Sequence, residues 1–253
     1  MDLPRNAFKA ALAAGRRQIG LWCTIPDPAV IEMHAGAGLD WIVIDTEHTP
    51  LDAERVMPLL QAASAYPVSA CVRPGANDST EIKKLMDAGA QTVIVPYVQS
   101  GAEAEAAVAA MHYPPRGMRG VGGATRSSGF GRIPGYVSRA GAEICAIVQV
   151  ETVAGLDALD DILAVPDLDG VFIGPADLST SMGHPDDLTA PPVRAAILDA
   201  TRRIRAAGKA PGILSHDRGM LADAEAAGAL FLAVGVDLVL LREAVAAART
   251  ARG

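Results

Sequence analysis

Short apolar runs recur eight times along the chain, and each is bounded by turn or charged residues. They cover residues 19–23, 41–44, 68–72, 92–95, 144–150, 171–173, 210–214 and 230–234. Continuous apolar runs of this length are typical of parallel strands that are covered on both faces. The pattern therefore predicts eight buried strands.

Helical segments separate these runs. Residues 52–65, 79–88, 192–207 and 218–227 are rich in Ala, Glu and Leu, and their apolar positions have the spacing of an amphipathic helix. Strict alternation of strand and helix predicts a parallel sheet of the α/β class. Eight such units in 253 residues match a closed (β/α)₈ TIM barrel, a single domain over residues 1–253. The alternative is an open, doubly wound sheet, which more often has five or six strands.

One glycine-rich and cationic stretch, residues 112–143, interrupts the alternation. It contains Arg119-Gly120-Val121-Gly122-Gly123 and Arg126-Ser127-Ser128-Gly129. Two interpretations stay open for it, a flexible excursion and a functional loop over the mouth of the barrel.

The charge balance narrows the choice of partner. The net charge is −7, and Lys and Arg form no block, which argues against nucleic acid or an anionic membrane and favours a small-molecule ligand. Cys23, Cys71 and Cys145 lack the spacing of a zinc site and the even count of a disulfide framework, so we expect buried, reduced thiols. The apolar runs are too short to cross a bilayer. We therefore expect a soluble, cytoplasmic protein.

Polar residues follow the predicted strands at their carboxyl ends, which is where (β/α)₈ barrels place their active sites. The polar residues are Asp45, His48, Arg73, Gln149, Glu151 and Asp177, and two apolar residues, Leu214 and Val236, end the last two strands. The strand ends thus predict a polar site with an apolar wall.

Glu151 and Asp177 follow two consecutive buried strands. Ionised carboxylates in such positions need a compensating partner, and together they predict a shared cation. Oxygen ligands favour Mg²⁺ or Mn²⁺ over zinc, which prefers His and Cys. The alternative for each carboxylate is a helix cap or an ion pair with an Arg.

Other strand-end residues suit acid–base and anion chemistry. His48 is a candidate base because the pKa of histidine lies near working pH. The planar guanidinium of Arg73 can donate hydrogen bonds to a carbonyl and a carboxylate. The alternative is a salt bridge within the rim of the barrel. Pro175, at a first helical position, leaves the neighbouring amides available for a substrate carboxylate, although a plain helix cap explains it as well.

The positions of the lysines argue against imine chemistry. Lys9, Lys83 and Lys84 fall on predicted helices, and Lys209 lies at the entry of the seventh strand, on the opposite face. The sequence therefore predicts no Schiff-base lysine, so a carbanion would be stabilised by metal and Arg73.

Ordered motifs span almost the whole chain: Gly20-Leu21-Trp22, Ile44-Asp45-Thr46-Glu47-His48, Val72-Arg73-Pro74, Gln149-Val150-Glu151-Thr152, Gly174-Pro175-Ala176-Asp177-Leu178 and Ala233-Val234-Gly235-Val236-Asp237. They resemble the metal-dependent pyruvate aldolases of the HpcH/HpaI family. The resemblance implies a class II aldolase that adds pyruvate or hydroxypyruvate to an aldehyde and gives a 4-hydroxy-2-oxo acid such as 4-hydroxy-2-oxoheptanedioate. It also implies a divalent metal, Mg²⁺ or Mn²⁺ with Co²⁺ or Zn²⁺ as alternatives, and a homohexamer built from dimers.

The resemblance also implies a role for each residue. Glu151 and Asp177 bind the metal, His48 is the base, and Arg73 stabilises the enolate in one polar cluster with Asp45. The residues implied to contact substrate are Trp22, Arg73, Arg126, Gln149, Gly174, Pro175, Ala176, Leu214 and Val236.

Asp87 is implied to orient the histidine, yet it ends the helix before the fourth strand and so lies at the opposite end of its own barrel. An acidic residue at a helix C-terminus is also electrostatically disfavoured. We therefore predict that Asp87 reaches the site of a neighbouring subunit. The excursion departs from the family pattern because it is shorter and lacks a second Arg before Phe130. We predict that Arg126 and Phe130 tune the choice of aldehyde but not the activation of pyruvate.

Rival functions remain. A CoA-thioester lyase of the same superfamily would need a wide basic groove, which the sequence does not indicate. A non-catalytic keto-acid-binding barrel would not exchange the C3 protons of pyruvate. A phosphosugar barrel is disfavoured because the last two strands lack a glycine-rich phosphate cradle.

Overall fold

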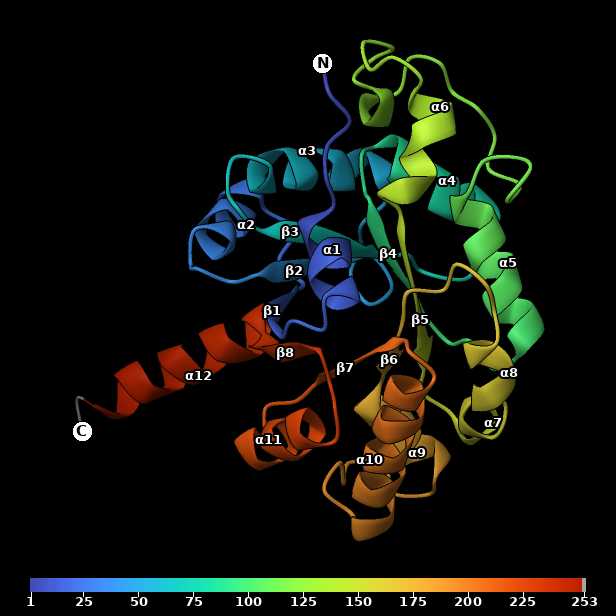
Figure 1. The fold of residues 1–253 in the computed structure, drawn as a ribbon. Helices are drawn as coiled ribbons and strands as arrows, with labels where there is room; N and C mark the ends of the chain where they lie inside the picture. The colour runs from blue at the N-terminus through green and yellow to red at the C-terminus, as the bar shows by residue number, and fades with distance from the viewer. Residues whose placement is uncertain (252–253) are drawn as a thin grey trace.

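A closed ring of eight parallel strands forms the centre of the protein in the computed structural model, which describes residues 1–251 (Figure 1). The strands are β1 Gln18–Cys23, β2 Trp41–Asp45, β3 Ser69–Arg73, β4 Thr92–Val95, β5 Cys145–Val150, β6 Gly170–Ile173, β7 Ala210–Leu214 and β8 Phe231–Val236. Each pairs with the next, and β8 pairs with β1. The predicted (β/α)₈ barrel is confirmed, and its strand bounds differ from the expected ones by no more than two residues.

Helices follow the strands around the outside of the ring (Figure 1). They are α2 Pro28–Ala35, α3 Ala53–Ala63, α4 Ser79–Asp87, α5 Gly101–Met111, α7 Val153–Asp157, α8 Leu159–Leu163, α9 Pro175–Ser181, α10 Pro191–Ala206 and α11 Arg218–Ala226. Several begin at a residue whose side chain accepts a hydrogen bond from the first turn, as Asp52, Asp78, Ser100 and Thr152 do. Such caps satisfy otherwise unpaired amides and fix where each loop at the barrel mouth ends.

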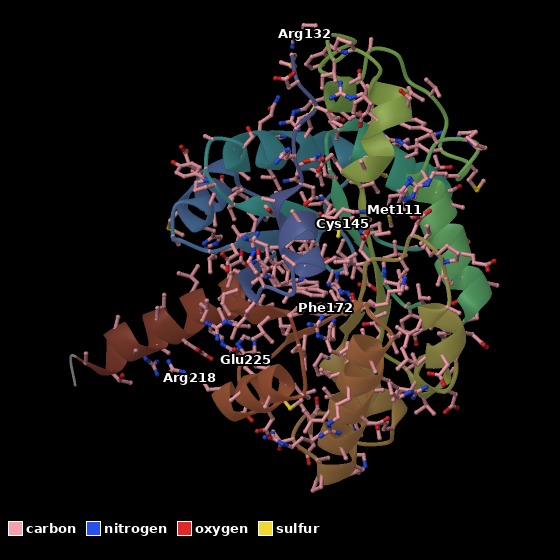
Figure 2. The ribbon with its side chains drawn as sticks, viewed as in Figure 1. Met111, Arg132, Cys145, Phe172, Arg218 and Glu225 are labelled. Carbon is pink, nitrogen blue, oxygen red and sulfur yellow. The ribbon has the colours of Figure 1, made fainter. Side chains whose placement is uncertain are left out.

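Aromatic side chains fill the inside of the barrel. Phe172 lies within the ring of strands (Figure 2), and it belongs to the same apolar core as Trp41 and Phe231. The N-terminal helix α1 (Ala7–Ala13) closes the amino end, where the Phe8 ring lies 5.5 Å from both other aromatic rings, Trp41 and Phe231. Gly20 makes this packing possible, because a Cβ there would overlap the Trp41 ring. The barrel is therefore plugged at its amino end.

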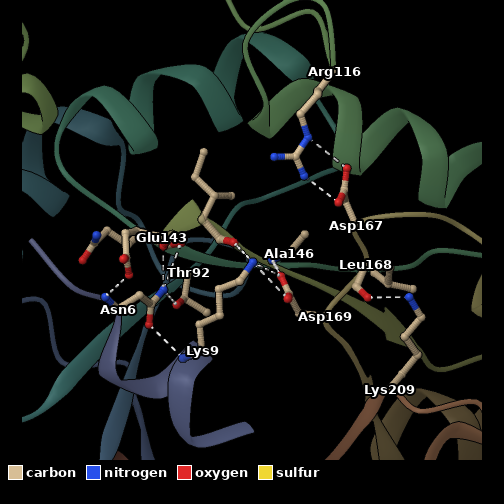
Figure 3. A network of polar contacts seen from close by, with 12 residues as sticks. Asn6, Lys9, Thr92, Arg116, Glu143, Ala146, Asp167, Leu168, Asp169 and Lys209 are labelled. Atoms are coloured by element: carbon tan, nitrogen blue, oxygen red, sulfur yellow. Dashed lines mark hydrogen bonds and ion pairs between the residues drawn. The ribbon is translucent and has the colours of Figure 1, made fainter. Parts of the chain in front are cut away.

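A polar network ties α1 to the barrel floor (Figure 3). Lys9 Nζ donates a hydrogen bond to the carbonyl of Ile144 (2.5 Å) and pairs with Asp169 (3.0 Å). Lys209 Nζ donates to the carbonyl of Leu168 (2.7 Å) on the same floor. Both ammonium groups thus serve to join floor segments.

The glycine-rich excursion lies at the floor end, because α5 returns the chain to that end before β5 begins. Arg126 Nη1 donates to the carbonyl of Ala88, just after α4 (2.9 Å), and Arg132 lies on the side where the N-terminus emerges (Figures 1 and 2). Short helices order the segment: η1 Arg126–Ser128, α6 Tyr136–Arg139 and η2 Ala140–Ala142. The interpretation of a loop over the mouth of its own barrel is therefore wrong.

The last helix, α12 (Asp237–Thr250), extends away from the barrel (Figure 1). Asp237 is its one buried residue within the described chain. Its apolar side chains are exposed, namely Leu238, Leu240, Leu241 and Val245, and so is Val234 on the outer face of β8. A barrel helix normally covers its own strand, so this chain leaves an apolar surface uncovered.

All three cysteines are unpaired and buried, as predicted. Within residues 1–251, the helices are too short or too polar to span a bilayer.

Candidate active site

The strand-end residues occupy inward positions. Successive side chains of a strand point to opposite faces, and Val43, Cys71, Ile147 and Phe172 belong to the inner core. Two positions further along the same strands are Asp45, Arg73, Gln149 and Gly174. These residues therefore face the barrel axis at the mouth, where Glu151 follows Gln149 at the same spacing.

Arg73 is held in one orientation. Its Nε donates to Asp45 Oδ1 (2.8 Å) and its Nη2 to Asp45 Oδ2 (2.7 Å), while Nη1 lies 2.5 Å from Glu47 Oε2. The guanidinium carbon lies 4.8 Å from the centre of the Trp22 ring. Because Arg73 and Asp45 are both buried, solvent screens this bidentate pair only weakly. The result is a fixed positive group that can stabilise charge developing nearby.

Glu151 is a buried carboxylate that has no cationic partner within residues 1–251. Oε1 accepts a hydrogen bond from the Tyr97 amide (2.7 Å), and Oε2 accepts one from Gln149 Nε2 (2.5 Å). Gly174 makes room for it, because a Cβ there would overlap Oε2 and lie 2.8 Å from the Glu151 Cβ. The pKa of Glu151 is raised from 4.5 to about 7, mainly by burial; the charges of Glu47 and Asp177 add to the rise, whereas the Tyr97 amide and Arg73 oppose it.

Glu47 belongs to the same cluster, although the predicted site did not include it. Burial raises its pKa most, the charges of Arg73 and His48 lower it, and those of Asp45 and Asp177 raise it. The sequence did carry a signal, because Glu47 stands two positions after Asp45.

Tyr97 was missed as well, and here the sequence carried no signal. Its backbone has a φ of 58°, which is uncommon for a residue other than glycine and is frequent at functional sites. This conformation aims the Tyr97 amide at Glu151 Oε1. The hydrogen bond to Glu151 comes from the Tyr97 backbone, so the type of residue at this position does not predict it.

His48 and Asp177 lie on the solvent side of the cluster. The His48 side chain is 66% exposed, with Nε2 4.0 Å from Glu47 Oε2. Asp177, in the first turn of α9, is exposed, yet its charge raises the pKa of Glu151. A cavity of about 710 Å³ beside the cluster is lined by Glu47, Tyr97, the loops after β3 and β4 and the start of α5. The cavity is large enough for a small ligand.

Trp22, Leu214 and Val236 lie together on the other side of the mouth. The Trp22 ring lies 5.1 Å from that of Phe172, and Leu214 and Val236 pack against the same inner core. Val236 pairs with Trp22 beyond an irregular step in the β1–β8 register. The mouth thus has one polar and one apolar side.

The turn after β6 offers backbone donors. Pro175 is the first residue of α9, and Gly174 caps the helix. The Gly174 amide donates to the carbonyl of Val150 (3.1 Å), so it is engaged in the sheet. The amides of Ala176 and Asp177 precede Leu178 N, which is the first amide to donate within the helix, so they have no intrahelical partner. They are the donors of this turn that face solvent.

Asp87 and Arg126 lie at the floor end, far from the other predicted site residues. Asp87 Oδ1 accepts a hydrogen bond from Arg119 Nη2 (2.7 Å), and the buried Arg119 stacks on Tyr113 at 4.6 Å. Burial lowers the pKa of Arg126, whose guanidinium contacts the end of α4. Neither residue reaches the mouth of its own barrel.

The charges and ligand atoms at the mouth fit a divalent cation. Arg73 pairs with Asp45, the last residue of β2, and with Glu47, and within the described chain no ion pair reaches Glu151 or Asp177. Among residues 1–251, the buried Gln149 Oε1 finds no hydrogen-bond partner. Carboxylate and amide oxygens are the ligands that Mg²⁺ and Mn²⁺ prefer. Glu151 and Asp177 are therefore the residues able to hold such a metal.

Within the described chain, no lysine lies at the mouth in a position to form a Schiff base. Lys9 and Lys209 bind floor carbonyls, and Lys83 and Lys84 lie on α4 outside the strands. Fold and site together define a (β/α)₈ barrel that combines acidic oxygen ligands with one fixed guanidinium. This combination is suited to stabilising an anionic intermediate.

Comparison with known proteins identifies the family. A model of the HpcH/HpaI aldolase/citrate lyase family matches residues 18–244. A hydroxypyruvate/pyruvate aldolase of Sagittula stellata is 51% identical over 249 residues, which is 98% of each chain. A 4-hydroxy-2-oxo-heptane-1,7-dioate aldolase of Salmonella dublin is 50% identical over 238 residues, 94% of this chain and 90% of that one.

A crystal structure supports the same conclusion. An HpcH/HpaI aldolase/citrate lyase family protein from Burkholderia cenocepacia J2315 superposes with a TM-score of 0.93 at 34% identity, over 98% of this chain and 100% of that one. The protein therefore belongs to the HpcH/HpaI aldolase/citrate lyase family, as the resemblance predicted, and is a carbon–carbon lyase.

Proposed function

We propose that the protein is a divalent-metal-dependent aldolase, which adds pyruvate or hydroxypyruvate reversibly to an aldehyde and gives a 4-hydroxy-2-oxo acid. The observation that carries this proposal is the buried carboxylate of Glu151, which forms no ion pair within residues 1–251 and accepts a hydrogen bond from Gln149. The names of the relatives at 51% and 50% identity support the substrate class.

Glu151 and Asp177 hold the metal, which is Mg²⁺ or Mn²⁺, with Co²⁺ or Zn²⁺ as alternatives. When bound, the metal polarises the keto oxygen and accepts charge as C3 loses a proton. The amide of Gln149 reaches the same ligand, since its Nε2 lies 2.5 Å from Glu151 Oε2, and it orients the keto-acid.

The chain's own groups perform the remaining steps. Arg73 binds the keto-acid and stabilises the enolate, while the amides of Ala176 and Asp177 hold the substrate carboxylate. His48 takes a proton from C3, the enolate carbon attacks the aldehyde, and the protonated histidine returns the proton to the new alkoxide. The same groups in reverse cleave the product.

Asp87 completes the site of a neighbouring subunit, where it orients His48. Coexpression of Asp87→Asn and His48→Ala chains tests this, because mixed assemblies then contain sites with both native groups. Activity well above that of either variant alone is expected. If mixing restores nothing, Asp87 does not act across subunits.

Arg126 and Phe130 share the floor end with Asp87, and Phe130 is 58% exposed. They face the incoming aldehyde of the neighbouring site. Replacing both with Ala is expected to change the relative rates with short and long aldehydes and to leave C3 exchange of pyruvate intact. Unchanged aldehyde selectivity would remove them from the site.

The protein assembles as a homo-oligomer, a hexamer by family resemblance, and a second copy covers α12. Leu238, Leu241 and Val245 recur along one side of this helix and are each at least 52% exposed. A Leu241→Asp, Val245→Asp variant is expected to give smaller assemblies by light scattering. The control is Arg242→Asp, which adds the same side chain at an exposed charged position. Equal masses for all three proteins would contradict this role for α12.

A metal screen tests the proposed activity. Chelator-treated protein is resupplied with Mg²⁺, Mn²⁺, Co²⁺ or Zn²⁺ and assayed for aldol addition and retro-aldol cleavage. Activity is expected only with metal, and borohydride with pyruvate is expected to leave the enzyme active. Activity in chelator would refute the metal dependence. The three unpaired thiols suit a reducing compartment, so we place the enzyme in the cytoplasm.

A further inference from the structure

Three potential metal ligands meet on the outer side of the barrel wall. Cys23 ends β1 and, next to the inward Trp22, belongs to the outer core; His34 lies in the last turn of α2, and Asp237 begins α12. The Cys23 Sγ, a His34 ring nitrogen and an Asp237 carboxylate oxygen all lie within 4.8 Å of one another. None of the three takes part in the proposed aldol chemistry.

The polar contacts leave this cluster incomplete. Asp237 Oδ1 accepts hydrogen bonds from Thr24 N, Thr24 Oγ1 and Leu238 N, whereas Oδ2 accepts only one, from Ile25 N (3.0 Å). Oδ2 faces His34 Nε2 at 3.6 Å, beyond hydrogen-bond distance. His34 Nε2 is buried, and no residue that the structure describes gives it a hydrogen-bond partner. A buried, unpartnered nitrogen beside a carboxylate oxygen with spare capacity is unusual and needs an explanation.

The thiol is equally short of partners. The Cys23 Sγ lies 3.9 Å from the carbonyl oxygen of Leu21, which is a long contact for a hydrogen bond. Burial raises the pKa of Cys23, and the charge of Asp237 adds to this. A bound divalent cation reverses that balance, because a coordinating thiol is deprotonated outright. One thiolate and one carboxylate then neutralise the two charges of the ion, and the imidazole stays neutral.

We propose that Cys23, His34 and Asp237 bind a thiophilic divalent metal ion, with zinc as the best match. Sulfur, imidazole nitrogen and carboxylate oxygen are the three ligand types of protein zinc sites, and a fourth position remains for water. The ligand atoms must close to roughly 3.5 Å from one another, a small movement for side chains already within 4.8 Å. The oxygen ligands at the mouth suit harder ions, so the two sites differ in preference.

The location gives the ion a structural consequence. Asp237 is the first residue of α12, and its hydrogen bonds reach Thr24 and Ile25 after β1. An ion that joins it to Cys23 and His34 fixes the direction in which α12 leaves the barrel.

Cobalt tests the proposal directly. The metal-free, full-length protein is titrated with Co²⁺, and a thiolate-to-cobalt charge-transfer band is expected in the near ultraviolet. Glu151→Gln and Cys71→Ala should keep the band, since one removes a mouth ligand and the other a buried thiol outside the cluster. Cys23→Ser should lose it, and His34→Gln should weaken Co²⁺ binding at least tenfold. A missing band in the native protein, or one that survives Cys23→Ser, overturns the proposal.

A second measurement covers the case in which Cys23→Ser does not fold. X-ray absorption of the native protein loaded with zinc is expected to show one sulfur neighbour at about 2.3 Å. A zinc environment of oxygen and nitrogen alone would overturn the site.

Discussion

The clearest consequence of the mouth electrostatics concerns Glu151 in the metal-free protein. This residue is 1% exposed, and its pKa is raised from 4.5 to about 7, mainly by burial. Between pH 4.5 and about pH 7, Glu151 keeps its proton in the folded protein but has lost it in the unfolded chain. Stability of the metal-free protein must therefore fall as pH rises through this window.

The magnitude follows from the shift. A rise from 4.5 to about 7 corresponds to about 3 kcal/mol of lost stability above pH 7, at 1.36 kcal/mol for each unit. Glu151→Gln removes the charge and keeps the shape. Gln149 can accommodate the change, because its buried Oε1 has no partner and a flipped amide would accept from the new side chain.

The assay is urea unfolding in chelator at fixed protein concentration. Glu151→Gln is expected to be about 3 kcal/mol more stable than the native protein at pH 8, with the difference shrinking toward pH 4.5. Metal at a hundred times its Kd should restore about 2.7 kcal/mol to the native protein and little to the variant. The control is Glu105→Gln on the exposed face of α5, which should show no such pH dependence. A variant no more stable than the native protein at pH 8 would refute the reasoning.

Three further predictions concern metal binding and activity. Gly174→Ala places a Cβ against Glu151 and should weaken metal binding at least tenfold by calorimetry, while Gly219→Ala, on α11, should not; equal affinities would mean that Gly174 does not set the ligand position. Arg73→Lys loses the bidentate hold on Asp45 and should lower kcat/KM on the order of a hundredfold or more; a loss below tenfold would argue against enolate stabilisation by Arg73. Asp87→Asn should lower kcat and shift the acidic limb of the rate–pH profile, and an unchanged profile would exclude its action on His48.

The fold was predictable because its signals are local. Buried parallel strands read as continuous apolar runs, and their alternation with helices leaves few topologies. Most of the mouth cluster was predictable for a related reason, since parallel strands bring their carboxyl ends to one edge and residues two apart share a face. Glu47 follows Asp45 by this rule and belongs in the same set.

Other features depend on information that no single position carries. The amide of Tyr97 contributes through a left-handed backbone conformation, and Arg119 meets Asp87 from 32 residues away. The meeting of Cys23, His34 and Asp237 likewise needs three elements to be placed first. The location of the excursion could have been predicted from the sequence, because a segment between a helix and the next strand of a barrel lies at the floor.

Exchange of the C3 protons of pyruvate tests the central claim most directly. The claim is that a cation held by Glu151 and Asp177 accepts the charge of the deprotonated keto-acid. The reaction is run in deuterated water, and Mn²⁺ is removed afterwards, before the NMR spectrum is recorded. The native protein with Mn²⁺ should exchange these protons. The chelator-treated native protein and the Glu151→Gln and Asp177→Asn variants should not. Exchange that persists in chelator, or that survives loss of both carboxylates, would contradict the account.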